Sequence, residues 1–176
     1  MPLLEKWLGS EETGRPFVFC ISCKLPLLEV DAPWLVNKEF KGSECVLEYA
    51  ICQPCREGFT NRFSERAKES VRGFLKQEID WDQWLEESMR SDVPEERLAA
   101  CISCRQPRTE ISGFAISALF DSGGELVMGP LPLLICDNCT ERMTRGLGEE
   151  GREIWGDFLT DHFQDPPGNG YFPGMM

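Results

Sequence analysis

The sequence predicts an α+β fold made of two homologous units that are joined by a short helical connector. The segment Cys20-Ile21-Ser22-Cys23 returns as Cys101-Ile102-Ser103-Cys104, and a second CxxC pair returns in the same way. Apolar residues after each second pair repeat with the spacing of an α-helix face. We therefore expect one unit at residues 1–80, the connector at 81–97, the second unit at 98–164 and an irregular tail at 165–176.

The repeat changes its offset between the two CxxC pairs. The first pair recurs 81 residues later, whereas Cys52-Gln53-Pro54-Cys55 recurs as Cys136-Asp137-Asn138-Cys139, 84 residues later. The three additional residues of the second unit must lie between its two pairs, where a loop can absorb them.

A β-hairpin is expected between the two pairs of each unit. In the first unit, apolar segments at 34–40 and 45–51 flank the turn-forming sequence Lys41-Gly42-Ser43-Glu44. In the second unit, segments at 114–120 and 125–128 flank Asp121-Ser122-Gly123-Gly124.

Each unit is expected to end in a helix, at roughly 56–79 and roughly 140–163. The second sequence is the weaker helix former, because each of its three glycines costs about 1 kcal/mol relative to alanine. In the connector, Trp81, Trp84, Leu85 and Met89 have helical spacing, and Ser91-Asp92-Val93-Pro94 indicates a further helix start.

Two CxxC pairs brought together by a hairpin provide four thiolates for a tetrahedral zinc ion. The pairs also suit zinc because the second pair of each unit starts a helix, whose amino end favours negative charge. We expect two zinc ions per chain, bound by Cys20, Cys23, Cys52 and Cys55 and by Cys101, Cys104, Cys136 and Cys139. With four protein ligands each site is closed to water, which predicts a structural role and no catalysis by the metal. Iron in a rubredoxin-like site and thiol redox chemistry remain alternatives.

The order of CxxC turn, hairpin, CxxC turn and helix resembles the treble-clef and zinc-ribbon classes of zinc-binding units. The likeness covers residues 17–80 and 98–163 and concerns architecture and ligand spacing, and it implies no particular activity. Where treble clefs usually have glycine after the first CxxC turn, this chain has Lys24 and Arg105.

Two further candidates for chemistry have simpler structural interpretations. Cys45 has no counterpart in the second unit, so we expect a small buried apolar side chain rather than a reactive thiol. The single histidine, His162, follows Phe158 on the apolar helix face, and we expect it to pack or cap rather than to act as a base.

The charge distribution bears on possible partners. The net charge is −12, with −2 in residues 1–80 and −10 in residues 81–176, and such a surface repels nucleic acid. The first helix carries basic residues that could contact phosphate, but acids are interleaved with them at helical spacing. These basic residues are Arg56, Arg62, Arg66, Lys68, Arg72 and Lys76. Trp34, Trp81 and Trp84 could stack on bases, although acids next to the last two favour packing instead.

These observations predict a non-enzymatic, zinc-stapled protein that acts as a protein–protein interaction or adaptor module. Nucleic-acid binding through the first helix is the alternative, and an enzyme with an unrecognised site between the units is a second one. The sequence shows no signal peptide and no transmembrane stretch, so we expect a cytoplasmic protein without membrane contacts. In that reducing compartment, paired cysteines favour metal over disulfides.

Overall fold

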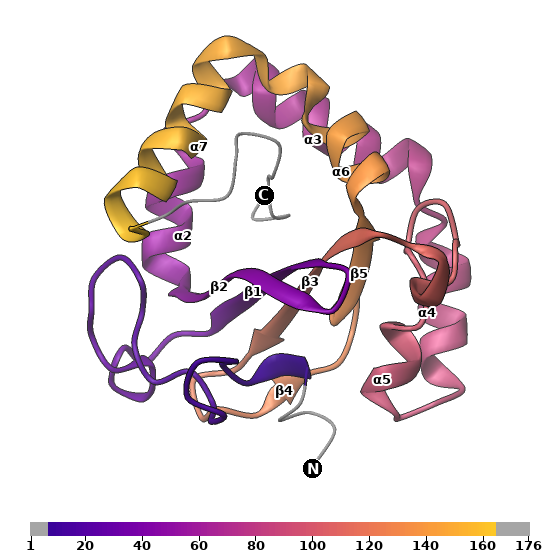
Figure 1. Cartoon of the computed structure of the whole chain (residues 1–176), viewed down its shortest axis with the longest axis horizontal. Helices are drawn as coiled ribbons and strands as arrows, with labels where there is room; N and C mark the ends of the chain where they lie inside the picture. Colours follow the sequence, from indigo (N-terminus) through magenta and orange to yellow (C-terminus); the bar gives the residue numbers. More distant parts are fainter. Residues whose placement is uncertain (1–6, 165–176) are drawn as a thin grey trace.

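The computed structural model describes residues 7–164 and places strands from both predicted units in one five-stranded antiparallel sheet (Figure 1). The strands are β1 (Trp34–Lys41), β2 (Glu44–Cys52), β3 (Gly113–Phe120), β4 (Leu126–Val127) and β5 (Leu133–Cys136). Their order is β2-β1-β3-β4, and β5 also pairs with β3. The predicted α+β fold with two repeated four-cysteine groups is confirmed, whereas the expected tail at 165–176 lies outside the described residues.

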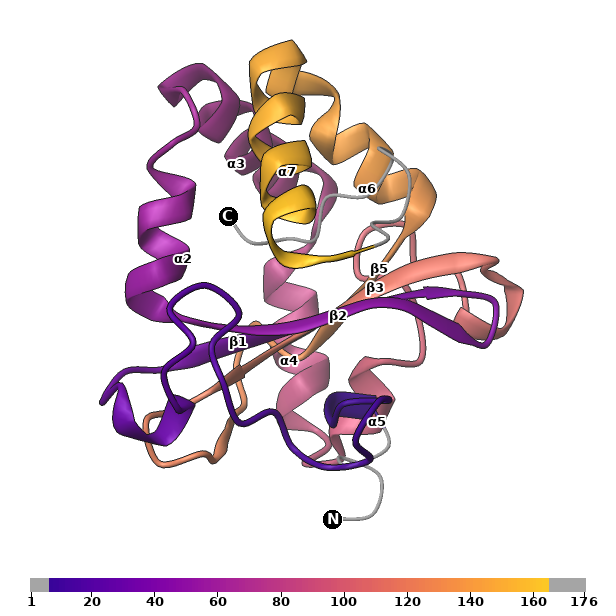
Figure 2. The same ribbon diagram turned by 60° about the vertical axis from the view of Figure 1, so that its left-hand side comes forward.

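Four helices cover one face of this sheet, and the connector lies beside it (Figures 1 and 2). The α-helices of the described residues, including the two of the connector, are α2 (Gln53–Thr60), α3 (Glu65–Glu78), α4 (Trp81–Met89), α5 (Pro94–Arg97), α6 (Asp137–Thr144) and α7 (Gly148–His162). Three short 3-10 helices are η1 (Leu27–Glu29), η2 (Arg108–Glu110) and η3 (Arg145–Leu147). The covering helices are α2, α3, α6 and α7, so that both units contribute equally to this layer.

The predicted single helix of each unit is wrong in its continuity, because each is divided into two. In the first unit the chain turns after Thr60, and the Ser64 hydroxyl accepts a hydrogen bond from the Ala67 amide at 3.1 Å, which starts α3 afresh. In the second unit Gly148, the first residue of α7, takes a left-handed φ of 70°, which separates α7 from α6 and η3. The apolar spacing continues through both breaks, so the sequence pattern did not reveal them.

The first predicted hairpin is confirmed, and the second is only partly correct. Its predicted return strand shrinks to β4, and the strand that carries Cys136 is β5, which the sequence analysis missed. Pro130 and Pro132 separate β4 from β5 because proline has no amide hydrogen to donate to a neighbouring strand.

The two units are related by an approximate two-fold axis in the middle of the sheet. Trp34 pairs with Cys52 as Phe114 pairs with Cys136, so residues of β1 correspond to residues of β3 that are 80 positions later. In this correspondence Asn37 matches Ser117, and these two residues face each other directly across β1 and β3. The axis therefore passes between them.

Aromatic packing on the face opposite the helices follows the same symmetry. Trp34 stacks on Phe120 with ring centroids 5.9 Å apart, and the equivalent pair, Phe114 and Phe40, stacks at 5.1 Å. Trp7 packs edge-on against Phe40 and brings the amino-terminal segment across this face. Both faces of the central strands are therefore covered.

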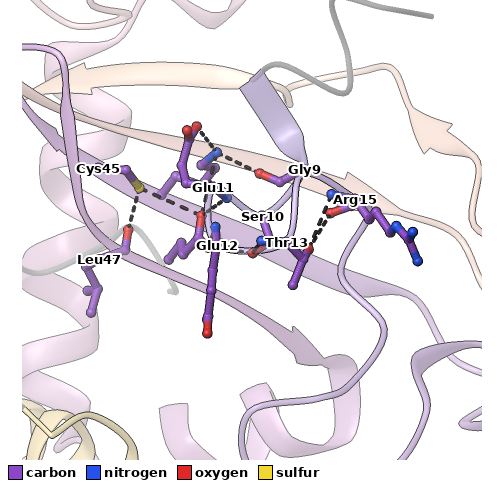
Figure 3. Close-up of polar contacts among 10 residues, drawn as sticks. Gly9, Ser10, Glu11, Glu12, Thr13, Arg15, Cys45 and Leu47 are labelled. Carbon is purple, nitrogen blue, oxygen red and sulfur yellow. Dashed lines mark hydrogen bonds and ion pairs between the residues drawn. The ribbon is translucent and has the colours of Figure 1, made fainter.

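A buried lysine of β1 fixes the amino-terminal segment to the sheet, and Figure 3 labels residues of that segment between Gly9 and Arg15. Lys38 is fully buried, and its ammonium group donates to the Gly9 carbonyl and to Glu11 Oε1, at 2.7 Å each. Glu48 in β2 lies 3.7 Å away and accepts from the Ser10 hydroxyl at 2.7 Å. The charge of Lys38 is thus compensated by two carboxylates and a carbonyl, as a buried cation requires.

The connector is held against the second unit by hydrogen bonds to the loop between β4 and β5. Trp84 Nε1 donates to the Pro130 carbonyl at 3.0 Å, and Arg97 donates to the Leu131 carbonyl at 3.0 Å. Arg105, directly after the first CxxC pair of the second unit, forms an ion pair with Glu87 of α4. The division of the chain into units at 1–80 and 98–164 stays a prediction, since their strands belong to one sheet.

Candidate metal centres

Each first CxxC pair lies in a tight turn that the backbone closes identically in both units. The Lys24 amide donates to the Cys20 carbonyl at 3.0 Å, and the Arg105 amide donates to the Cys101 carbonyl at 2.9 Å. Lys24 and Arg105 adopt left-handed φ values of 63° and 64°. The turn thus requires the conformation that glycine adopts most easily, and a side chain there costs roughly 1–2 kcal/mol.

Each second CxxC pair lies where a strand changes into a helix. Cys52 ends β2 and precedes α2, with Cys55 in the first helical turn, and Cys136 and Cys139 occupy the same places in β5 and α6. One backbone hydrogen bond joins the two pairs of each unit: Ile21 to Ala50 and Ile102 to Leu134, both at 2.8 Å. The sheet register therefore positions all four sulfurs.

The structure brings each predicted group of four cysteines together, with all four sulfurs within 4.8 Å of one another. Cys23 and Cys52 have sulfurs 3.9 Å apart, and Cys104 and Cys136 have sulfurs 3.7 Å apart. A tetrahedron with metal–sulfur bonds of about 2.3 Å has edges of about 3.8 Å. The two quartets therefore have the size of a metal-thiolate site.

The pKa values show why a cation suits these quartets. Burial disfavours the Cys20 thiolate, but amide hydrogen bonds, first from Cys52, outweigh burial and lower the pKa of Cys20 to about 7. Burial raises the pKa of Cys136 to about 11, and a hydrogen bond with Cys139 together with burial raises that of Cys101 to about 12. Four thiolates at this spacing repel one another, and a divalent cation removes that cost.

Burial also suits the quartets to a structural role. In the first quartet Cys20 and Cys52 are buried, and only Cys23 is exposed. In the second, only Cys104 is exposed. Four protein sulfurs complete a tetrahedron, so the quartets favour structural metal binding over catalysis.

The ninth cysteine lies apart from both quartets. Cys45 is half-buried at the start of β2, where its thiol contacts the Leu47 carbonyl at 3.5 Å and Glu48 at 3.8 Å (Figure 3). Burial raises the pKa of Cys45 to about 12, with the charge of Lys38 opposing this shift and the charges of Glu48 and Glu11 adding to it. Its thiol is therefore protonated at neutral pH and unreactive, although it is less buried than expected.

His162 packs against an aromatic side chain of its own helix. Its ring lies edge-on against Phe158, with centroids 4.7 Å apart, and burial lowers its pKa. This agrees with the packed histidine that the sequence indicates.

The basic residues of the first helix do not form one strip, because they are divided between α2 and α3. Lys68 pairs with Glu65 at 2.7 Å, and Arg62 lies 3.6 Å from Asp157 of the other unit. The three tryptophans considered for base stacking are occupied in packing: Trp34 stacks on Phe120, and Trp81 and Trp84 donate to backbone carbonyls. Nucleic-acid binding through these residues stays a prediction to be tested.

Three buried charged residues and one cavity were missed by the sequence analysis, and one of these residues is Arg97 of α5, which is 7% exposed. Lys38 and Glu39 are both nearly inaccessible in the middle of β1, where a charged pair between apolar strand residues was the only sequence signal. The cavity lies beside Arg56 and depends on packing between the units.

Comparison of the chain with protein-family models, curated proteins and solved structures returned no match. Among the helices within residues 7–164, none has the length and apolar character needed to cross a bilayer.

Proposed function

We propose that the two cysteine quartets bind zinc ions that hold the fold, in units of the treble-clef type. Zinc matches a closed set of four sulfurs at tetrahedral spacing, and because it is redox-inactive it suits a purely structural site. The left-handed conformation of Lys24 and Arg105 supports the treble-clef assignment, since these positions meet the same backbone requirement as the usual glycine.

The function supported best is that of a non-enzymatic protein–protein interaction module. The observation that carries this proposal is a group of exposed apolar side chains at the first CxxC turn, here named the knuckle patch. It consists of Val18, Phe19, Leu25 and Leu28, which are exposed to 56, 58, 55 and 65%. Phe19 pairs with Pro26, so the two arms of one projecting turn present these side chains.

The second unit provides an internal comparison for the knuckle patch. Its equivalent positions hold Ala99, Ala100, Gln106 and Thr109 around a turn with the same backbone hydrogen bonds. Folding of the turn therefore does not require large apolar residues at these positions. Exposed apolar groups that the fold does not need are typical of a contact surface.

Charge favours a particular class of protein partner. The net charge of −12 opposes binding of a second copy and of nucleic acid. A partner segment with apolar side chains flanked by basic residues would complement both the knuckle patch and the overall charge.

Photo-crosslinking in the native cell tests this proposal. A photoreactive residue in place of Leu25 should yield a discrete protein adduct, whereas one in place of Met89, which is 86% exposed on the connector, should not. Grafting the second unit's residues as Val18→Ala/Phe19→Ala/Leu25→Gln/Leu28→Thr should abolish co-purification of that protein. Equal adducts at both positions would contradict the assignment of the knuckle patch.

Gel-shift assays with duplex DNA, single-stranded DNA and RNA test the nucleic-acid alternative. At about 150 mM salt we expect no shift, because the basic residues of α3 alternate with acids. Tight, salt-sensitive binding that is lost in Arg62→Glu/Arg66→Glu would overturn the interaction-module proposal.

A further inference from the structure

A second feature lies away from the metal centres, in a cavity of about 180 Å³ between the sheet and the helices. Its floor includes Leu35, Ser117 and Ile135, from three neighbouring strands. Leu75 and Ile79 at the end of α3 form part of its wall. The lining is predominantly apolar, as in small-molecule sites of proteins.

Arg56 of α2 is the charged residue of this lining. It is half-buried, and within residues 7–164 no hydrogen bond or ion pair engages its guanidinium group. Its position contrasts with the other half-buried or buried bases of the described residues, which all have carboxylate or carbonyl partners: Lys38, Lys68, Arg97 and Arg108. A planar guanidinium beside an apolar cavity matches a carboxylate, which it can bind through two parallel hydrogen bonds.

The approximate two-fold axis shows what the same space contains in the other half of the molecule. The cavity residues Leu133, Ile79 and Met143 correspond to Tyr49, Phe163 and Phe59. Tyr49 is buried and packs against Phe158 and Phe163, with ring centroids 5.5 and 6.2 Å apart. Aromatic rings thus fill the region that is a cavity on the other side of the axis.

Polar groups at the two places also correspond. The Tyr49 hydroxyl accepts a hydrogen bond from Asn37 Nδ2 at 3.2 Å, and the counterpart of Asn37 on the cavity floor is Ser117. The counterpart of Arg56 is Thr140, so the filled side has no cation at this position. The cavity therefore differs from its counterpart in two respects: Leu133 stands in place of the tyrosine ring that fills the other side, so that Trp81 is the aromatic residue of the lining, and the cavity gains a positive charge.

We propose that this cavity binds a small aromatic carboxylate, with the ring in the place that Tyr49 takes on the filled side and the carboxylate on Arg56. The volume suits one ring, because an engineered apolar protein cavity of about 150 Å³ binds benzene. The carboxylate accounts for a half-buried cation that has no partner among the described residues. This site is independent of the knuckle patch and of the interaction proposed there.

Calorimetric titration of the full-length, zinc-loaded protein with benzoate and with the neutral isostere benzamide tests the site. We expect saturable binding of benzoate, about tenfold tighter than that of benzamide, which is the size of effect that one charged hydrogen-bonded pair gives. Arg56→Gln should remove this preference. Lys76→Gln removes one positive charge from the exposed face of α3 and should leave the preference unchanged.

A second variant tests the location of the ring. Leu133→Tyr introduces the residue of the filled side and should abolish binding of both compounds, and Ile79→Phe does the same if the tyrosine variant fails to fold. Far-ultraviolet circular dichroism and zinc content verify folding of each variant. The proposal is overturned if benzoate does not saturate at about 10 mM, if Arg56→Gln and Lys76→Gln act equally, or if a folded, cavity-filled variant binds as before.

Discussion

At the scale of single residues, Glu39 is a buried acidic group without a polar partner among the described residues. It is 1% exposed in β1, and neither of its carboxylate oxygens has a hydrogen-bond partner. Burial, followed by the charge of Asp137, raises the pKa of Glu39 to about 8. The side chain is therefore protonated and neutral over much of the physiological pH range.

Because the pKa of Glu39 is higher in the folded state than in the unfolded chain, the folded state binds its proton more tightly. The resulting stabilisation is complete below the unfolded pKa and is lost as pH rises through about 8. Between pH 6 and pH 8 the free energy of unfolding should fall by about 2–3 kcal/mol in the parent protein. Glu39→Gln should remove this slope, which urea unfolding at several pH values would measure. The exposed Glu69→Gln should retain the slope, and an equal slope in all three proteins would contradict the assignment.

Lys24 and Arg105 also destabilise the fold locally, because their backbones adopt the left-handed conformation. Lys24→Gly should raise the free energy of unfolding by about 0.5–1 kcal/mol, since relief of the left-handed strain exceeds the entropy that glycine adds to the unfolded chain. Denaturant unfolding of the zinc-loaded protein measures this change. Arg72→Gly, inside α3, should instead lower the stability by about 1 kcal/mol. If both substitutions lowered the free energy of unfolding, the Lys24 side chain would make a contact that stabilises the fold by more than the left-handed strain costs.

At the scale of secondary-structure elements, each quartet joins a turn, a strand end and a helix start. Cys20→Ser or Cys136→Ser should reduce bound zinc from two ions to one per chain and lower the melting temperature strongly, because metal binding is coupled to folding. Cys45→Ser, remote from both quartets, should retain two ions and a near-parental melting temperature. Elemental analysis of protein purified without added metal, together with thermal melts, measures both effects. Iron in place of zinc, or equal damage from Cys45→Ser, would show that the ligands or the metal are misassigned.

The elements that could be predicted are those with a local sequence signal. The first hairpin has a turn at Lys41-Gly42-Ser43-Glu44, and the quartets follow from cysteine spacing alone. The strand β5 was missed because it is a short apolar run after proline, although the 84-residue offset matches it to the end of β2. The Arg56 cavity has no such signal, since its walls come from both units and from the connector.

At the scale of the whole molecule, the two units form one sheet and one core rather than two separate domains. Their central strands pair along β1 and β3, with Asn37 accepting a hydrogen bond from Ser117 at 2.6 Å on the two-fold axis. Their helices are also in contact, because Glu78 of α3 in the first unit forms an ion pair with Arg142 of α6 in the second. Tyr49 of the first unit is covered by Phe158 of the second. Each half thus completes the core of the other, which explains how units of about 80 residues reach sufficient burial.

This mutual covering predicts that damage to one unit spreads to the other. Phe158→Ala in α7 should cost about 3–5 kcal/mol, the usual range for a fully buried ring. In hydrogen exchange, the amides of β2 in the first unit should lose as much protection as those of β5 in the second, because both strands belong to one cooperative sheet. The equivalent residue of the first unit, Phe74, is only half-buried, so Phe74→Ala should produce the same pattern with a smaller loss. If Phe158→Ala deprotected β5 alone and left β2 unchanged, the units would be independent domains that merely touch, and the shared-core description would be wrong.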